Sequence, residues 1–272
     1  MPRISRSVLI AAVAALLVAG CATVKTTQSG AVGVDRSQAM LVSSREVNQS
    51  AEKQYAQAIG QARQKELLNR NPAETERVRA IAKRLIPQTT VFRPDASGWR
   101  WEVNVLTSDQ LNAWCMPGGK IAVYSGLIDK LKLSDDEIAA IMGHEIAHAL
   151  REHARERISQ QMATSTVIGI GAAVLGVGSA GADLGNLVAQ VTFTLPNSRT
   201  HEIEADRIGV ELAARAGYDP RAAVSVWQKM AKASDGGPPQ FLSTHPSPEN
   251  RIKDLEVYAQ RVMPLYEAAR KK

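Results

Sequence analysis

Residues 134–150 are SDDEIAAIMGHEIAHAL, and this stretch predicts one well-defined helix. Ser134 is a favoured N-cap residue, and Glu137 stands three residues later, where its carboxylate completes a capping box. The acidic residues of the first turn also favour the positive end of the helix dipole. We expect the helix to begin after Ser134 and to continue to Arg157.

The same helix contains a His-Glu-x-x-His motif. His144 and His148 are four residues apart, about 40° around the helix and one turn along it, so their imidazoles can meet at one metal ion. Neutral imidazole suits Zn²⁺, and three protein ligands leave the fourth position open for water. Glu145 can take a proton from that water, whose pKa zinc lowers to about 7. The motif predicts one Zn²⁺ per chain, with Glu145 as the general base.

The third ligand must come from another segment, and an oxygen ligand is expected because the chain has only 2 Cys. If Glu202 begins a helical turn, Asp206 lies one turn later on the same face. Glu202 would then bind zinc while Asp206 accepts a hydrogen bond from a ligand histidine. Periodicity alone does not choose Glu202 over Glu204.

Two other histidines are not expected to bind the metal. His153 lies nine residues after His144, on the opposite face of a continuous helix, within the charged run 151–157 that we expect to be solvated. His201 is next to Glu202 but about 100° around its helix.

The rest of the chain predicts a mainly helical α+β fold. Helical patterns cover residues 47–68 and 73–86, and β-type alternation covers residues 99–105 and 119–124, with a turn at 117–119. Residues 158–198 form an apolar, Gly- and Ala-rich insert whose only charge is Asp183. Two interpretations of its core, residues 164–182, stay open: a buried or flexible helical hairpin, or a segment that faces a membrane or a partner.

The N-terminus resembles an export signal. Residues 1–20 combine two arginines with an apolar run too short to cross a bilayer. They end in small residues directly before Cys21, as in the lipobox of bacterial lipoproteins, where this cysteine is acylated. Residues 21–46 are expected to form a tether, and residues 47–272 a single domain. Residue 22 is Ala rather than Asp, which favours the outer membrane.

Composition excludes several other classes. The 22% charged and 44% hydrophobic residues are typical of a globular protein, and 2 Cys cannot build a disulfide framework. Aromatic residues are 4%, and the formal charge of +6 is not gathered into one block, so nucleic-acid binding is not favoured. Cys115 follows Trp114 in an apolar stretch and is expected to be a buried, inert thiol.

Several stretches together resemble the gluzincin metallopeptidases of the HtpX and CAAX prenyl protease type, and in layout the periplasmic lipoprotein members LoiP and BepA. Beside the His-Glu-x-x-His motif, Ser198-Arg199-x-x-Glu202-x-x-x-Asp206 is similar to the family's second motif. Residues 112–127 are similar to its edge strand before the zinc helix, and residues 244–252 to its His-Pro and Arg-Ile motif. The resemblance covers roughly residues 70–265 and implies a zincin-like protease domain.

By this resemblance, His144, His148 and Glu202 are the zinc ligands, Glu145 is the catalytic base, and Asp206 is a catalytic acid that either supports a ligand or donates a proton. His245 has two interpretations: a removable fourth ligand that keeps the site latent, or a structural His-Pro turn. Arg251 either stabilises the oxyanion of the reaction or pairs with a helix acid.

The sequence therefore predicts a zinc endopeptidase of the bacterial cell envelope, anchored by lipid on Cys21 and facing the periplasm. Its substrates would be misfolded or unassembled proteins, bound as a strand beside residues 119–124. The alternative is a lipid-anchored assembly factor or chaperone of the outer membrane, with a latent or structural zinc site.

Overall fold

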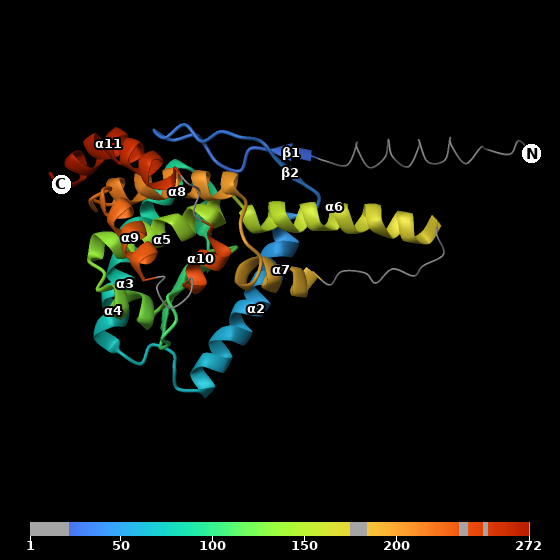
Figure 1. Ribbon diagram of the computed structural model, residues 1–272, viewed down its shortest axis with the longest axis horizontal. Coiled ribbons are helices and arrows are strands. Elements are labelled where there is room, and N and C mark those ends of the chain that lie inside the picture. The colour runs from blue at the N-terminus through green and yellow to red at the C-terminus, as the bar shows by residue number, and fades with distance from the viewer. Residues whose placement is uncertain (1–21, 175–183, 234–238, 247–249, 272) are drawn as a thin grey trace, which may run out of the picture.

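The computed structural model describes residues 22–174, 184–233, 239–246 and 250–271. The predicted signal peptide and Cys21 lie outside these residues. The predicted α+β class is confirmed: helices make up most of the described chain, together with a three-stranded sheet and a two-stranded sheet (Figure 1). The helices not introduced below are α2 (Ser44–Gln64), α3 (Pro72–Leu85), α4 (Ser125–Leu131), α9 (Ala222–Lys232), α10 (Gln240–Thr244) and α11 (Arg251–Ala269), with the 3₁₀ turns η1 (Ile86–Val91) and η2 (Pro94–Gly98).

The main sheet has three strands in the order β3-β5-β4. Strand β5 (Lys120–Tyr124) pairs in parallel with β3 (Glu102–Leu106) and antiparallel with β4 (Ala113–Met116). The turn from β4 to β5 places Gly118 and Gly119 at φ +83 each, a conformation that glycine adopts without strain. The expectation that a substrate strand adds beside residues 119–124 is therefore wrong: β5 is the central strand, and β3 and β4 are the two edge strands.

Helix α5 (Asp135–Leu150) lies at the centre of the domain, and the predicted capping box of Ser134 and Glu137 is present. Its sides pack against α3, α8 (Arg199–Arg215), α9 and strand β4. From Ile138 onward every residue of α5 is buried. Close packing on all sides therefore holds the two histidines of the motif in place.

The predicted continuation of this helix to Arg157 is wrong. Helix α5 ends at Leu150, and α6 (His153–Val174) begins after a break. Glu152 has a left-handed backbone at φ 50, and its carboxylate pairs with Arg93 and Arg155. These ion pairs stabilise a backbone conformation that is unfavourable for glutamate. Most of the charged run 151–157 is consequently buried rather than solvated: Arg151 has 0% exposure, and only Ala154 and Arg155 are half-buried.

Residues 22–46 do not form a free tether. Strands β1 (Ala22–Val24) and β2 (Gln38–Met40) pair as an antiparallel ladder, and β2 lies against α6. Between them the chain follows the domain surface (Figure 1), where Val32 is buried and its amide donates to the Glu211 carboxylate at 2.9 Å. Buried apolar contacts and buried polar partners hold this segment in place.

The apolar insert contains the second half of α6 and helix α7 (Leu184–Phe193). Leu187, Val188 and Val191 of α7 are buried in one cluster with Val47 and Tyr55 of α2. These residues fit the buried-hairpin interpretation, while residues 175–183 lie outside the described part, as do the side chains of the last turns of α6. Among the described residues, no helix is long and apolar enough to cross a membrane.

Candidate metal centre and active site

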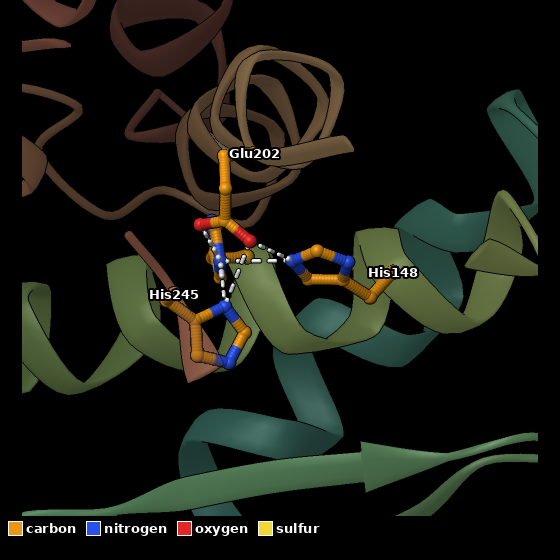
Figure 2. Close-up of side chains that lie close together, drawn as sticks. His148, Glu202 and His245 are labelled. Atoms are coloured by element: carbon orange, nitrogen blue, oxygen red, sulfur yellow. Dashed lines mark hydrogen bonds and ion pairs between the residues drawn. The ribbon is translucent and has the colours of Figure 1, made fainter. Parts of the chain in front are cut away.

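Four side chains bring one ligand atom each to a common point. His144 and His148 come from α5, Glu202 from the first turn of α8, and His245 from the residue that follows α10. All four are buried. Figure 2 shows His148, Glu202 and His245 pointing toward one another from three separate segments.

The distances between these atoms fit a tetrahedral metal. His144 Nε2 lies 3.0 Å from His148 Nε2 and 3.5 Å from Glu202 Oε2. His148 Nε2 lies 3.3 Å from Glu202 Oε1. His245 Nδ1 is 3.2 Å from His144 Nε2 and 3.0 Å from Glu202 Oε1. Ligands about 2.0–2.1 Å from zinc stand about 3.3 Å apart in a tetrahedron. The donor set of three imidazoles and one carboxylate fits Zn²⁺ at that point.

The protonation states of His148 and Glu202 also suit a metal. Burial holds the pKa of His148 well below its usual value, so its imidazole is neutral and can bind a cation. Burial raises the pKa of Glu202, but His245 and His148 lower it more, so the carboxylate is ionised.

Asp206 and Arg251 form hydrogen bonds with the ligands His144 and Glu202 on the sides that do not face the metal point. The Asp206 carboxylate accepts a hydrogen bond from His144 Nδ1 at 2.9 Å, which directs Nε2 toward the metal point. Arg251 donates to Glu202 Oε2 at 2.9 Å and to Asp206 Oδ1 at 2.7 Å, and its guanidinium lies 3.4 Å from the centre of the Trp227 ring. Of the two interpretations of Arg251, the geometry favours the pairing with helix acids.

The choice between Glu202 and Glu204 is now clear. Glu204 points away from the metal point and pairs with Arg36, Arg151 and His153. His201 is not among the four metal-facing residues: its Nε2 lies 3.1 Å from Glu156 Oε2.

Glu145 lies beside the metal point. Its side chain is buried, and Oε1 has no hydrogen-bond partner among the residues that the structure describes; His245 Nε2 stands 3.3 Å away. Burial raises the pKa of this carboxyl, an effect that His245 and His144 oppose. A cleft reaches Glu145 from outside, lined on one side by Cys115 of β4 and on another by Val191 of α7. Cys115 is thus half-buried at the cleft rather than enclosed in the core.

His153 was expected on the opposite face of the helix, in solvent, and both expectations are wrong. Because the chain turns at Glu152, the imidazole of His153 points back to α5, and its Nδ1 lies 2.9 Å from His148 Nδ1. Its exposure is 1%. No local signal in the sequence indicates this contact, because neither Gly nor Pro marks the break.

Comparison with known proteins agrees with this centre. The model of peptidase family M48 matches residues 72–259. The chain belongs to peptidase family M48. The matched residues include the four metal-facing residues, Glu145, Asp206 and Arg251, so the predicted gluzincin resemblance is confirmed at the level of this family. Zinc is the metal of M48 metallopeptidases, in agreement with the donor set.

Several curated proteins are similar to this M48 chain. The mitochondrial metalloendopeptidase OMA1 of Arabidopsis thaliana is 40% identical over 159 residues, 58% of this chain and 31% of that protein. Mitochondrial metalloendopeptidase OMA1 of Bos taurus is 34% identical over 202 residues, 70% of this chain and 38% of that protein. The β-barrel assembly-enhancing protease of Escherichia coli K12 is 26% identical over 206 residues, 72% of this chain and 41% of that protein. The chain spans between 31% and 50% of the length of the first relatives it matches.

Proposed function

We propose that this M48 chain is a zinc-dependent endopeptidase of the bacterial cell envelope that cleaves misfolded or unassembled proteins. One observation carries the proposal: the buried carboxylate of Glu145 lies beside the metal-facing residues, on a cleft that is open to solvent, and its Oε1 accepts no hydrogen bond from the described residues. A buried carboxylate oxygen that accepts no hydrogen bond is costly unless it serves the chemistry of the site.

Glu145, Asp206 and Arg251 have different roles in the proposed reaction. Zinc, when bound, polarises the scissile carbonyl and acidifies the attacking water. Glu145 accepts the proton of that water and donates it to the leaving amine. Asp206 and Arg251 keep His144 and Glu202 in place while the charge at the centre changes. Their direct contacts with the two ligands support this division.

The substrate would bind along β4. This strand pairs with β5 on one side only, and Cys115 in it lines the cleft that leads to Glu145. An extended polypeptide can add to such an edge through its backbone, without selection for a particular sequence. Backbone recognition suits unfolded clients, which expose main-chain groups.

His245 would keep the site latent. It stands at the fourth corner of the tetrahedron, and its Nε2 lies 3.3 Å from Glu145 Oε1. In this position it excludes the attacking water and contacts the base, so activity requires that His245 move away. A permanently closed site would instead favour the alternative, an assembly factor with structural zinc.

The location is proposed from the sequence. The lipobox before Cys21 supports a lipid anchor, with Ala22 favouring the outer membrane and the domain facing the periplasm. The name of the β-barrel assembly-enhancing protease supports a client among proteins that assemble in that membrane.

The test compares wild type with Glu145→Gln and Thr192→Ser, using unfolded casein with and without a chelator. Thr192 is the control, because it lines the same cleft but its hydroxyl donates to the backbone of its own helix α7, at Val188. We expect chelator-sensitive cleavage by wild type and the control, and stoichiometric zinc without cleavage in Glu145→Gln. Wild-type turnover in Glu145→Gln would overturn the mechanism. Stoichiometric zinc without cleavage in every variant, including His245→Ala, in which the latency is removed, would favour the assembly factor.

A further inference from the structure

A chain of buried polar side chains begins at the ligand His148 and leads away from the metal point. His148 Nδ1, the ring nitrogen that does not face the metal, lies 2.9 Å from His153 Nδ1. The other nitrogen of His153, Nε2, lies 3.0 Å from Glu204 Oε2. His148, His153 and Glu204 are all buried, so each contact is made without competition from water.

Glu204 is held firmly at the far end of this chain. Arg151 donates to its Oε2 at 3.0 Å, and Arg36, from the N-terminal segment, donates to its Oε1 at 2.6 Å. Arg36 also donates to Glu156, which fixes the guanidinium between two carboxylates. Glu204 therefore acts as a fixed acceptor.

The fixed acceptor determines where each proton lies. An ionised carboxylate only accepts, so His153 Nε2 carries the proton that it donates to Glu204. In a neutral imidazole the other nitrogen is then an acceptor, so His153 Nδ1 receives the proton of His148 Nδ1. With its proton on Nδ1, His148 presents an unprotonated Nε2 to the metal. We propose that His153 is a positioning residue, which orients His148 and selects its metal-binding tautomer.

A second metal centre is a weaker explanation of the same residues. His153, Glu156 and His201 each have a ligand atom within 4.8 Å of the others. However, the guanidinium groups of Arg36 and Arg151 occupy the adjacent carboxylates, and both nitrogens of His153 are already paired. Two fixed positive charges at this place disfavour a cation.

The proposal rests on the proposed zinc site and extends it by one residue. The ligand His144 has the usual carboxylate partner, Asp206, whereas His148 has a histidine partner backed by a carboxylate. Loss of such a partner typically weakens metal binding by about 10- to 100-fold.

The test uses two substitutions of His153, by Asn and by Gln, whose side-chain amides differ in their distance from the backbone by one methylene group. In His153→Asn the amide oxygen stands where Nδ1 stood and can still accept from His148. In His153→Gln the amide stands near the former Nε2, so it can meet Glu204 but not His148. His201→Asn is the matched control, because His201 stacks on His153 with ring centres 4.3 Å apart but is bonded to Glu156 instead of a ligand.

The readouts are zinc affinity, by competition with a chromophoric chelator, and the visible spectrum of the Co²⁺-loaded protein. Both use the full chain purified in detergent. We expect His153→Gln to weaken zinc binding about 10- to 100-fold and to change the Co²⁺ spectrum. His153→Asn and His201→Asn should lose less than about 10-fold, because in both the ligand His148 keeps a hydrogen-bond partner.

Three results would overturn the proposal. They are wild-type zinc affinity in His153→Gln, equal losses in the Asn and Gln variants, and an equal loss in His201→Asn. Failure of both His153 variants to fold, seen by circular dichroism, would also overturn it by giving His153 a purely structural role. Because metal affinity is measured directly, a chain that binds zinc but cleaves nothing would refute the peptidase proposal alone.

Discussion

Gly143 of α5 and Gly209 of α8 lie directly against each other where the two helices cross. A Cβ atom on Gly143 would stand 2.7 Å from the carbonyl oxygen of Gly209, and one on Gly209 would stand 2.6 Å from the backbone nitrogen of His144. This close approach sets the distance between the helix that carries His144 and His148 and the helix that carries Glu202. The metal centre thus depends on two residues without side chains.

Gly143→Ala should therefore cost stability and metal affinity together. The added methyl group meets backbone, which cannot rotate away, and overpacking of this kind costs about 1–3 kcal/mol. Gly60→Ala is the matched control, since Gly60 lies inside α2 with nothing within 4 Å of its added Cβ. There alanine should stabilise the chain by about 0.5–1 kcal/mol. Urea unfolding and zinc titration measure both effects. Equal stability changes in the two variants would contradict the account.

Arg251→Leu should strongly destabilise the metal-free chain. Arg251 is 2% exposed and pairs with both Glu202 and Asp206, so its removal takes the buried cation away from two buried carboxylates. Such losses amount to about 3–5 kcal/mol. Arg251→Lys, which keeps the charge but not the two-pronged geometry, should lose less. A Lys variant of wild-type stability that has lost only kcat would instead support the oxyanion interpretation.

Glu156 should make the fold sensitive to acid. Burial raises the pKa of its carboxyl, but hydrogen bonds from Arg36, His201 and Gln38 together lower it well below the usual value. A lowered native pKa stabilises the fold above the unfolded value of about 4.3, and this stability is lost as the pH falls below it. Unfolding free energies from pH 7 to pH 3 should fall less steeply in Glu156→Gln than in wild type. Parallel profiles would show that Glu156 does not contribute.

Cys115 offers a chemical test of the cleft. Burial and the nearby Glu145 raise the pKa of its thiol well above the usual value, so alkylation should be slow at pH 7 and should accelerate as the pH rises. Because Cys115 lines the cleft on β4, an N-ethylmaleimide adduct should block cleavage of casein while zinc is retained. Cys115→Ser should resist the reagent. Undiminished cleavage by the alkylated chain, verified by mass, would rule out β4 as the substrate strand.

The local chemistry of the site was predictable from sequence because it lies within short motifs. The spacing of His144 and His148 brings their imidazoles together on any helix, and Ser134 with Glu137 marks where that helix begins. Glu202 and Asp206 are also four residues apart, so any helix places them one turn apart on the same face. Glu202 could not be separated from Glu204 without the resemblance, because the angle of α8 against α5 is a tertiary property.

Long-range arrangements could not be predicted in the same way. The parallel pairing of β3 with β5 joins segments that are not consecutive, so the edge strand was misidentified. The left-handed Glu152 carries no local signal, because distant Arg93 stabilises it. Arg36 belongs to a Ser- and Thr-rich segment typical of a tether, yet its partners Glu156 and Glu204 bind it to the domain. In each case partners far along the chain decide the structure.

The most direct test of the central claim uses a site from which His245 has been removed. We would measure casein cleavage and bound zinc for His245→Ala and for the double variant His245→Ala/Glu145→Gln. The account predicts faster cleavage than wild type in the single variant, and zinc near one per chain without cleavage in the double variant. Equal cleavage by the two variants would contradict the assignment of Glu145 as the base, and with it the account of this centre.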